Sequence, residues 1–175
     1  MPRSALATNR HRPLNKGPRA GHEAYPAISV ALASMLAVLP IISSSGWWPS
    51  FGLVTLIAWR LLRADAWPAW WAAPLGFVND LLTGMPIGLS VTMWTAVMLV
   101  MDLVDERTQW RDYWIEWAVA AALIVVAEAV EWKVAEWSGA PVPFTLMLPA
   151  IVISILAFPL FGYLASRLDR WRLGQ

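Results

Sequence analysis

The sequence has no cysteine, which excludes disulfides, thiolate metal sites and cysteine nucleophiles. Its only histidines, His11 and His22, lie in the polar N-terminal segment, so the rest of the chain has no imidazole for a metal, a proton relay or a catalytic triad. Phosphate-binding loops, zinc-protease motifs and nucleophile elbows are also missing. We therefore expect a protein that is not an enzyme and that binds no cofactor or metal.

Charged residues are scarce at 14%, where ordinary soluble domains carry about 25%. What the chain has instead is a hydrophobic content of 58% and 13 tryptophans in 175 residues. Indole rings favour the headgroup level of a bilayer, so this composition indicates a membrane protein. The basic residues are dispersed along the chain, which gives no support for nucleic-acid binding.

The first 25 residues are basic and poor in apolar side chains, and we interpret them as a disordered cytoplasmic tail. The positive charges of this tail either only determine the membrane topology, or also attract the tail to anionic lipids at the cytoplasmic surface. We expect residues 26–172 to form a single membrane domain, with no soluble domain among them.

Apolar segments long enough to cross a bilayer recur along this domain, given that a crossing helix needs about 20 residues. The second is short, and we expect Arg60 and Arg63 to extend from its end toward the membrane surface. The predicted fold is an all-α polytopic bundle of six transmembrane helices, at residues 26–45, 49–62, 66–83, 86–104, 113–132 and 142–166.

The positions of the basic residues support this count. With six spans and a cytoplasmic N-terminus, twelve of the thirteen Lys and Arg residues fall on the cytoplasmic side, and only Lys133 lies opposite. Positive residues concentrate on that side of membrane proteins, so both termini are expected in the cytoplasm.

An acidic residue inside the third span, Asp80, is the first candidate for function, because charged groups in a membrane are costly. Asn79 and Thr83 are close enough in sequence to share hydrogen bonds with it. There are two interpretations. Asp80 either stabilises a tight hairpin by accepting hydrogen bonds from free backbone amides at the start of the next helix, or contacts another membrane protein or a small ligand.

The residues after Asp80 are typical of a tight turn. Gly84 and Gly88 are four residues apart and flank Pro86, a spacing that lets two backbones approach closely.

Carboxyl groups in the fifth span are the second candidate. Glu128 and Glu131 are three residues apart and share a helix face. We interpret Glu131, Lys133 and Glu136 as a cluster at the outer membrane surface, and Glu128 as a deeper carboxyl buried against another helix or in contact with a ligand.

The stretch GFVNDLLTGMPIG resembles the characteristic segment of the MreD family, inner-membrane proteins of the bacterial rod-shape system. The matching positions are Gly76, Asp80, Leu81, Leu82, Gly84, Pro86 and Gly88. The resemblance covers about residues 26–172. The length of this region, its short second span and its basic C-terminal end are all similar to those of the family. Asn79 stands where the family pattern also accepts an apolar residue.

This resemblance implies a non-enzymatic scaffold for lateral peptidoglycan synthesis in the bacterial inner membrane. The implied partners are MreC, the actin-like MreB, RodA and a class B penicillin-binding transpeptidase. The family is also distantly similar in fold to the S subunits of energy-coupling-factor transporters. Prolines in the spans predict bends that could enclose a cavity, so a substrate-binding transport subunit is the alternative.

Overall fold

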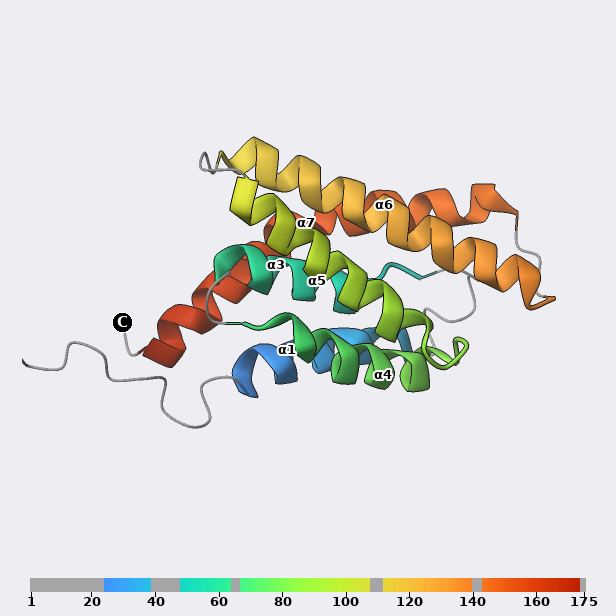
Figure 1. Ribbon diagram of the computed structural model, residues 1–175, viewed down its shortest axis with the longest axis horizontal. Helices are drawn as coiled ribbons and strands as arrows, with labels where there is room; N and C mark the ends of the chain where they lie inside the picture. The colour runs from blue at the N-terminus through green and yellow to red at the C-terminus, as the bar shows by residue number, and fades with distance from the viewer. Residues whose placement is uncertain (1–23, 39–47, 64–66, 108–111, 140–142, 174–175) are drawn as a thin grey trace, which may run out of the picture.

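The computed structural model describes residues 24–38, 48–63, 67–107, 112–139 and 143–173. These ranges contain helices and no strand, so the prediction of an all-α helix bundle is confirmed (Figure 1). Nearly all of the predicted basic tail, both histidines and Pro40 fall outside the described residues.

Each of the six predicted apolar segments contains a helix. The fourth helix begins at Leu89, because Pro86 and Gly88 belong to the turn before it. The last three helices extend beyond their predicted ends, since charged residues continue a helix after the apolar run stops. The bounds are α1 Ala24–Met35, the short 3-10 helix η1 Leu36–Val38, α3 Phe51–Leu62, η2 Ala69–Trp71, α4 Ala72–Thr83, α5 Leu89–Arg107, α6 Tyr113–Trp137 and α7 Phe144–Leu173.

Two helices, α6 and α7, are long and apolar enough to cross a membrane by length and composition. The apolar stretches Ala24–Val38, Phe51–Leu62 and Leu89–Val104 are shorter than a full crossing. Length and composition therefore support membrane crossing for two of the helices.

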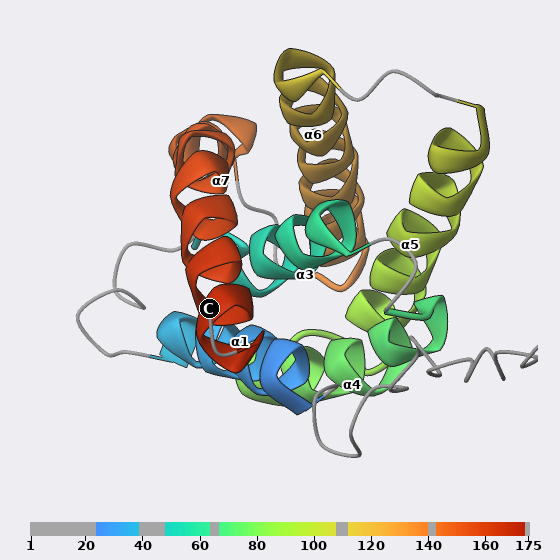
Figure 2. The same ribbon diagram turned by 90° about the vertical axis from the view of Figure 1, so that its left-hand side faces the viewer.

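Helix α3 lies at the centre of the bundle, surrounded by α1, α4, α5, α6 and α7 (Figure 2). Every residue from Gly52 to Arg60 is buried. At about 1.5 Å per residue its twelve residues span only about 18 Å, less than the hydrocarbon core of a bilayer. A helix this short is tolerated here because its neighbours enclose it.

Polar contacts fix α3 to three of those neighbours. Trp59 donates from Nε1 to the Ser29 hydroxyl of α1 at 2.7 Å. Arg60 is ion-paired with Asp102 of α5, and Arg63 donates from Nε and Nη2 to Oδ2 of Asp169 in α7, at 3.0 and 2.6 Å.

The expectation that Arg60 extends to the membrane surface is therefore wrong. Its side chain is only 6% exposed, because the Asp102 carboxylate offers it a partner inside the bundle. The Arg63 side chain is 39% exposed, yet it too is held by a carboxylate of another helix.

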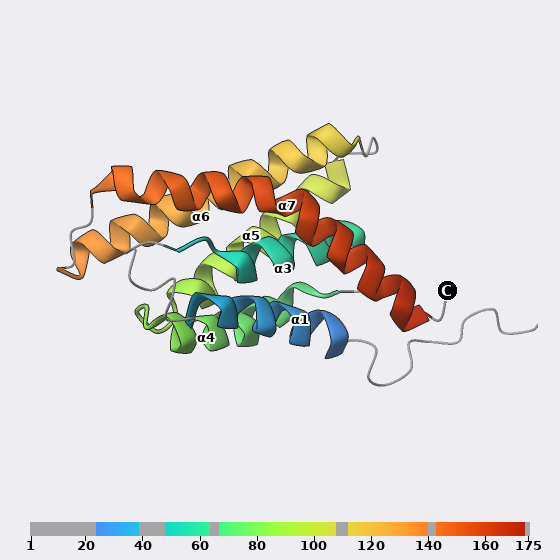
Figure 3. The ribbon, with the colours of Figure 1, turned by 180° about the vertical axis from the view of Figure 1, so that it is seen from behind.

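Helices α6 and α7 run antiparallel and side by side. Trp117 of α6 donates from Nε1 to the Ile155 carbonyl at 3.3 Å, and near the opposite end Trp132 contacts the Phe144 ring. Beyond this pairing α7 changes direction and crosses toward the start of α1 (Figure 3). Pro149 and Pro159 lie inside α7, and proline bends a helix because it removes a backbone donor and clashes with the preceding turn.

Candidate functional site: the hairpin between α4 and α5

Gly76 allows α4 and α5 to pack with their backbones in contact. A Cβ added at this buried glycine would lie 2.7 Å from the carbonyl carbon and oxygen of Ser90 and from the backbone nitrogen of Val91. No side chain fits in that space. The first glycine of the hairpin therefore sets the distance between the two helices.

The turn begins where Gly84 ends α4. Gly84 has φ +70° and ψ 17°, and its N–H bonds the Asp80 carbonyl at 3.0 Å. Gly88, just before α5, has φ +100°. Side chains rarely adopt positive φ, so both positions favour glycine for conformational reasons.

The expected close backbone approach at Gly84 and Gly88 is not observed, because a Cβ at either glycine would meet nothing within 4 Å. Close packing occurs at Gly76 instead. Sequence spacing alone does not show whether a position needs glycine because its φ is positive or because another backbone lies too close for a side chain.

Asp80 closes the hairpin from inside. Its side-chain oxygens accept from the Gly88 N–H at 2.7 Å and from the Ser90 N–H at 2.8 Å. These amides belong to the start of α5, where backbone donors have no partner within the helix. Asp80 is 1% exposed, and negative charge is favourable at a helix N-terminus, so it caps α5 from the preceding helix.

Asn79 and Thr83 form hydrogen bonds beside this contact and not with the Asp80 carboxylate, as had been expected. Asn79 donates from Nδ2 to the Ser90 hydroxyl at 2.9 Å, and Thr83 donates to the Asn79 carbonyl at 2.8 Å. Ser90 is buried, and it joins both contacts because its hydroxyl accepts from Asn79 while its N–H donates to Asp80. Of the two interpretations of Asp80, the hairpin contact is the one present in the geometry.

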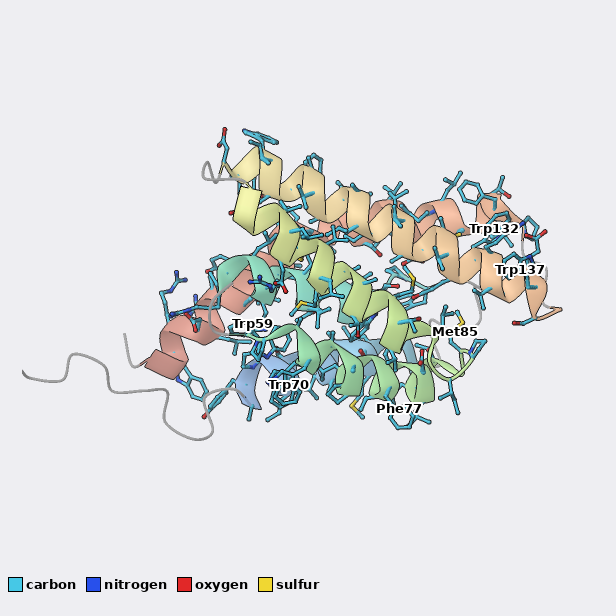
Figure 4. The ribbon with its side chains drawn as sticks, viewed as in Figure 1. Trp59, Trp70, Phe77, Met85, Trp132 and Trp137 are labelled. Atoms are coloured by element: carbon cyan, nitrogen blue, oxygen red, sulfur yellow. The ribbon has the colours of Figure 1, made fainter. Side chains whose placement is uncertain are left out.

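The tip of the hairpin is open and apolar. Pro86 is exposed, and Ile87 is 73% exposed. On α4 the side chains of Phe77 and Leu81 also face outward, and Figure 4 shows Phe77 pointing away from the bundle. The hairpin thus has a fixed polar interior and a free apolar exterior.

Two carboxyl groups of α6 lie near this polar interior. Glu128 is 0% exposed and Glu131 is 7% exposed, so the predicted shared face of α6 is a buried one. Asp80 of α4 and both of these α6 carboxyls are therefore buried inside the bundle, which sequence spacing could not show.

The predicted surface cluster of Glu131, Lys133 and Glu136 is only partly observed. Lys133 and Glu136 form an exposed ion pair at 2.7 Å, with the Lys133 ammonium 5.5 Å from the centre of the Trp132 ring. Glu131 is buried and so does not belong to that surface. Successive residues of an α-helix are about 100° apart around its axis. The two residues from Glu131 to Lys133 therefore turn the helix by about 200°, which places Lys133 on nearly the opposite face.

The ion pairs Arg60–Asp102 and Arg63–Asp169 were not anticipated. The available signal was an acidic residue, Asp102, inside an otherwise apolar span, which predicts a basic partner in another span.

Within the described ranges, no group of three or more His, Cys, Asp or Glu side chains is arranged to hold a metal ion. Comparison with protein-family models, with curated proteins and with solved structures gives no match.

Proposed function

We propose that this chain is a non-enzymatic scaffold of the bacterial cell-elongation machinery, set in the inner membrane with six spans and both termini in the cytoplasm. Its partners would be MreC and, directly or indirectly, MreB, RodA and a class B penicillin-binding transpeptidase.

The geometry of the α4–α5 hairpin carries this proposal. Four of the seven positions that resemble the MreD segment are also positions where the hairpin needs a particular residue type. Gly76 permits backbone contact, Gly84 and Gly88 take positive φ, and Asp80 caps α5. A stretch in which these four residues all shape one turn supports a role in presenting that turn.

The surface available for partners is consistent with scaffolding. The described chain consists of helices and short connections, so helix faces and loop tips are what a partner can contact. On the hairpin these are the exposed tip at Pro86 and Ile87 and the outward face of α4 at Phe77 and Leu81. We expect a membrane-anchored partner to bind there, because both surfaces are apolar and contiguous along one hairpin.

A substrate-binding subunit of a small-molecule transporter is the second candidate. One observation favours it, namely that three carboxyl groups, those of Asp80, Glu128 and Glu131, are buried inside the bundle. Buried carboxyls within a membrane domain are common at ligand and ion sites. Such a subunit would need an ATPase partner, since this chain has no nucleotide-binding motif.

The proposal is tested by depleting the protein in its own bacterium and measuring cell width and lateral wall labelling. The scaffold role predicts wider, rounded cells and weaker lateral labelling. Complementation with Ile87→Asp, which alters only the exposed tip, is expected to restore shape less well than the wild type. Unchanged width and labelling after depletion would exclude the scaffold role.

The same strain separates the two candidates. An Asp80→Ala protein that maintained normal shape but abolished uptake of a small molecule would favour the transport subunit. Loss of shape with no uptake defect would favour the scaffold.

A further inference from the structure

The last turns of α7 have two different faces. Phe158, Ala165 and Asp169 point into the bundle and are at most 7% exposed. Tyr163 and Trp171, which are eight residues apart with Arg167 midway, are 53% and 71% exposed. Residues four apart lie on one side of a helix, so Tyr163, Arg167 and Trp171 form an outward stripe.

The acidic residue of this segment does not neutralise its outward cations. Asp169 lies on the inner face, where it accepts from Arg63 of α3. Arg167 donates from Nη1 to the neutral Tyr163 hydroxyl at 3.2 Å. Arg167 and Arg170 are both exposed, and neither forms an ion pair with another described residue. This end of α7 therefore carries two exposed, uncompensated guanidinium groups.

The membrane placement proposed above would put the same turns at the depth of lipid headgroups. The 30 residues of α7 extend about 45 Å at 1.5 Å per residue, against about 30 Å of hydrocarbon core. Exposed Leu164 and Leu160 come about one and two turns before Arg167, so apolar surface gives way to charge along the helix. Trp171 contacts the Tyr25 ring edge-on at 6.2 Å between centroids, and such aromatic residues favour the membrane–water interface.

We propose that Arg167 and Arg170 bind the phosphate groups of anionic phospholipids, with Trp171 beside them at headgroup level. The planar guanidinium group donates two parallel hydrogen bonds to phosphate oxygens. Leu164 and Leu160, one and two turns deeper, offer an apolar surface to the acyl chains, which a free phosphate ion would not use. This inference depends on the membrane placement proposed above but not on a role in wall synthesis.

The test is native mass spectrometry of the purified full chain in neutral detergent, titrated with phosphatidylglycerol or phosphatidylcholine. The wild type is expected to bind phosphatidylglycerol more tightly. Arg167→Gln with Arg170→Gln should weaken that binding about fivefold for each charge removed and leave phosphatidylcholine unaffected. Lys133→Gln is the matched control, because it removes an exposed cation near Trp132 and Trp137, at the other end of the bundle (Figure 4).

Two results would overturn the inference. The first is an unchanged preference for phosphatidylglycerol in the double variant, with helix content by circular dichroism equal to that of the wild type. The second is complete displacement of phosphatidylglycerol by an equal concentration of inorganic phosphate, which would indicate a site for free anions. If the double glutamine variant does not fold, Arg167→Lys with Arg170→Lys serves instead, and a partial loss of binding is expected because lysine keeps the charge but lacks the two-pronged donor.

Discussion

A single carboxylate, that of Asp80, joins the end of one helix to the start of the next. Asp80 lies four residues before Gly84, the residue that caps the end of α4. Its carboxylate oxygens nevertheless accept hydrogen bonds from backbone N–H groups at the start of α5. Buried amides without partners are costly, and a carboxylate is a stronger acceptor than a neutral group. The hairpin is therefore rigid because of a residue outside the turn itself.

Replacing Asp80 by asparagine is expected to destabilise the hairpin. The amide keeps the size of the side chain but presents an NH₂ group to one of two backbone donors, leaving a buried donor unpaired. We expect a loss of about 1–3 kcal/mol in unfolding free energy, measured as a lower melting temperature of the purified protein in detergent.

Glu136→Gln is the control for Asp80→Asn, because it breaks only the exposed pair with Lys133. Its expected cost is about 0.5 kcal/mol or less. Equal melting temperatures for the two variants would contradict the capping role of Asp80.

Gly76→Ala and Gly162→Ala form a matched pair that tests backbone contact. The new methyl group at Gly76 would lie 2.7 Å from backbone atoms of α5, whereas at Gly162 in α7 it would meet nothing within 4 Å. We expect Gly76→Ala to cost about 1–3 kcal/mol through overpacking. Gly162→Ala should be neutral or stabilise by up to about 1 kcal/mol, since alanine favours a helix. Similar thermal unfolding of the two variants would disprove close packing at Gly76.

At the scale of helices, apolar runs were enough to locate all six, because a helix that faces lipid or other helices is apolar along most of its length. The tertiary roles were harder to predict. Whether Glu131 is buried depends on which helices pack against α6, and whether Arg60 reaches the surface depends on Asp102, which is 42 residues away. The local contacts of Asp80 were predictable, because its partners follow within ten residues.

The ion pair between α3 and α5 is expected to couple the two helices. Arg60→Asp would place two negative charges together, and so would strongly destabilise the protein, while Asp102→Arg would do the same with two positive charges. The double swap should recover part of the loss, with a coupling energy on the order of 1–3 kcal/mol in a double-mutant cycle of thermal stability. Additive effects of the two changes would show that the pair does not hold α3 in place.

For the whole molecule, the proposed topology puts the hairpin tip and the C-terminal end of α7 on opposite sides of the membrane. The natural chain has no cysteine, so single cysteines can be introduced without a background. Ile87→Cys and Trp137→Cys should react with a membrane-impermeant maleimide in intact spheroplasts, because both positions are exposed. Trp171→Cys should react only after permeabilisation. Labelling of Ile87→Cys and Trp171→Cys from the same side would contradict six spans.

The central claim is that the Asp80-capped hairpin assembles partners of the elongation machinery. It is tested most directly by co-purifying a tagged protein from membranes, in wild-type, Asp80→Ala and Ile87→Asp forms at matched expression, and identifying bound proteins by mass spectrometry. We predict recovery of MreC or the wall synthases with the wild type and reduced recovery with both variants. Recovery of a transporter ATPase, with no elongation proteins, would contradict the claim.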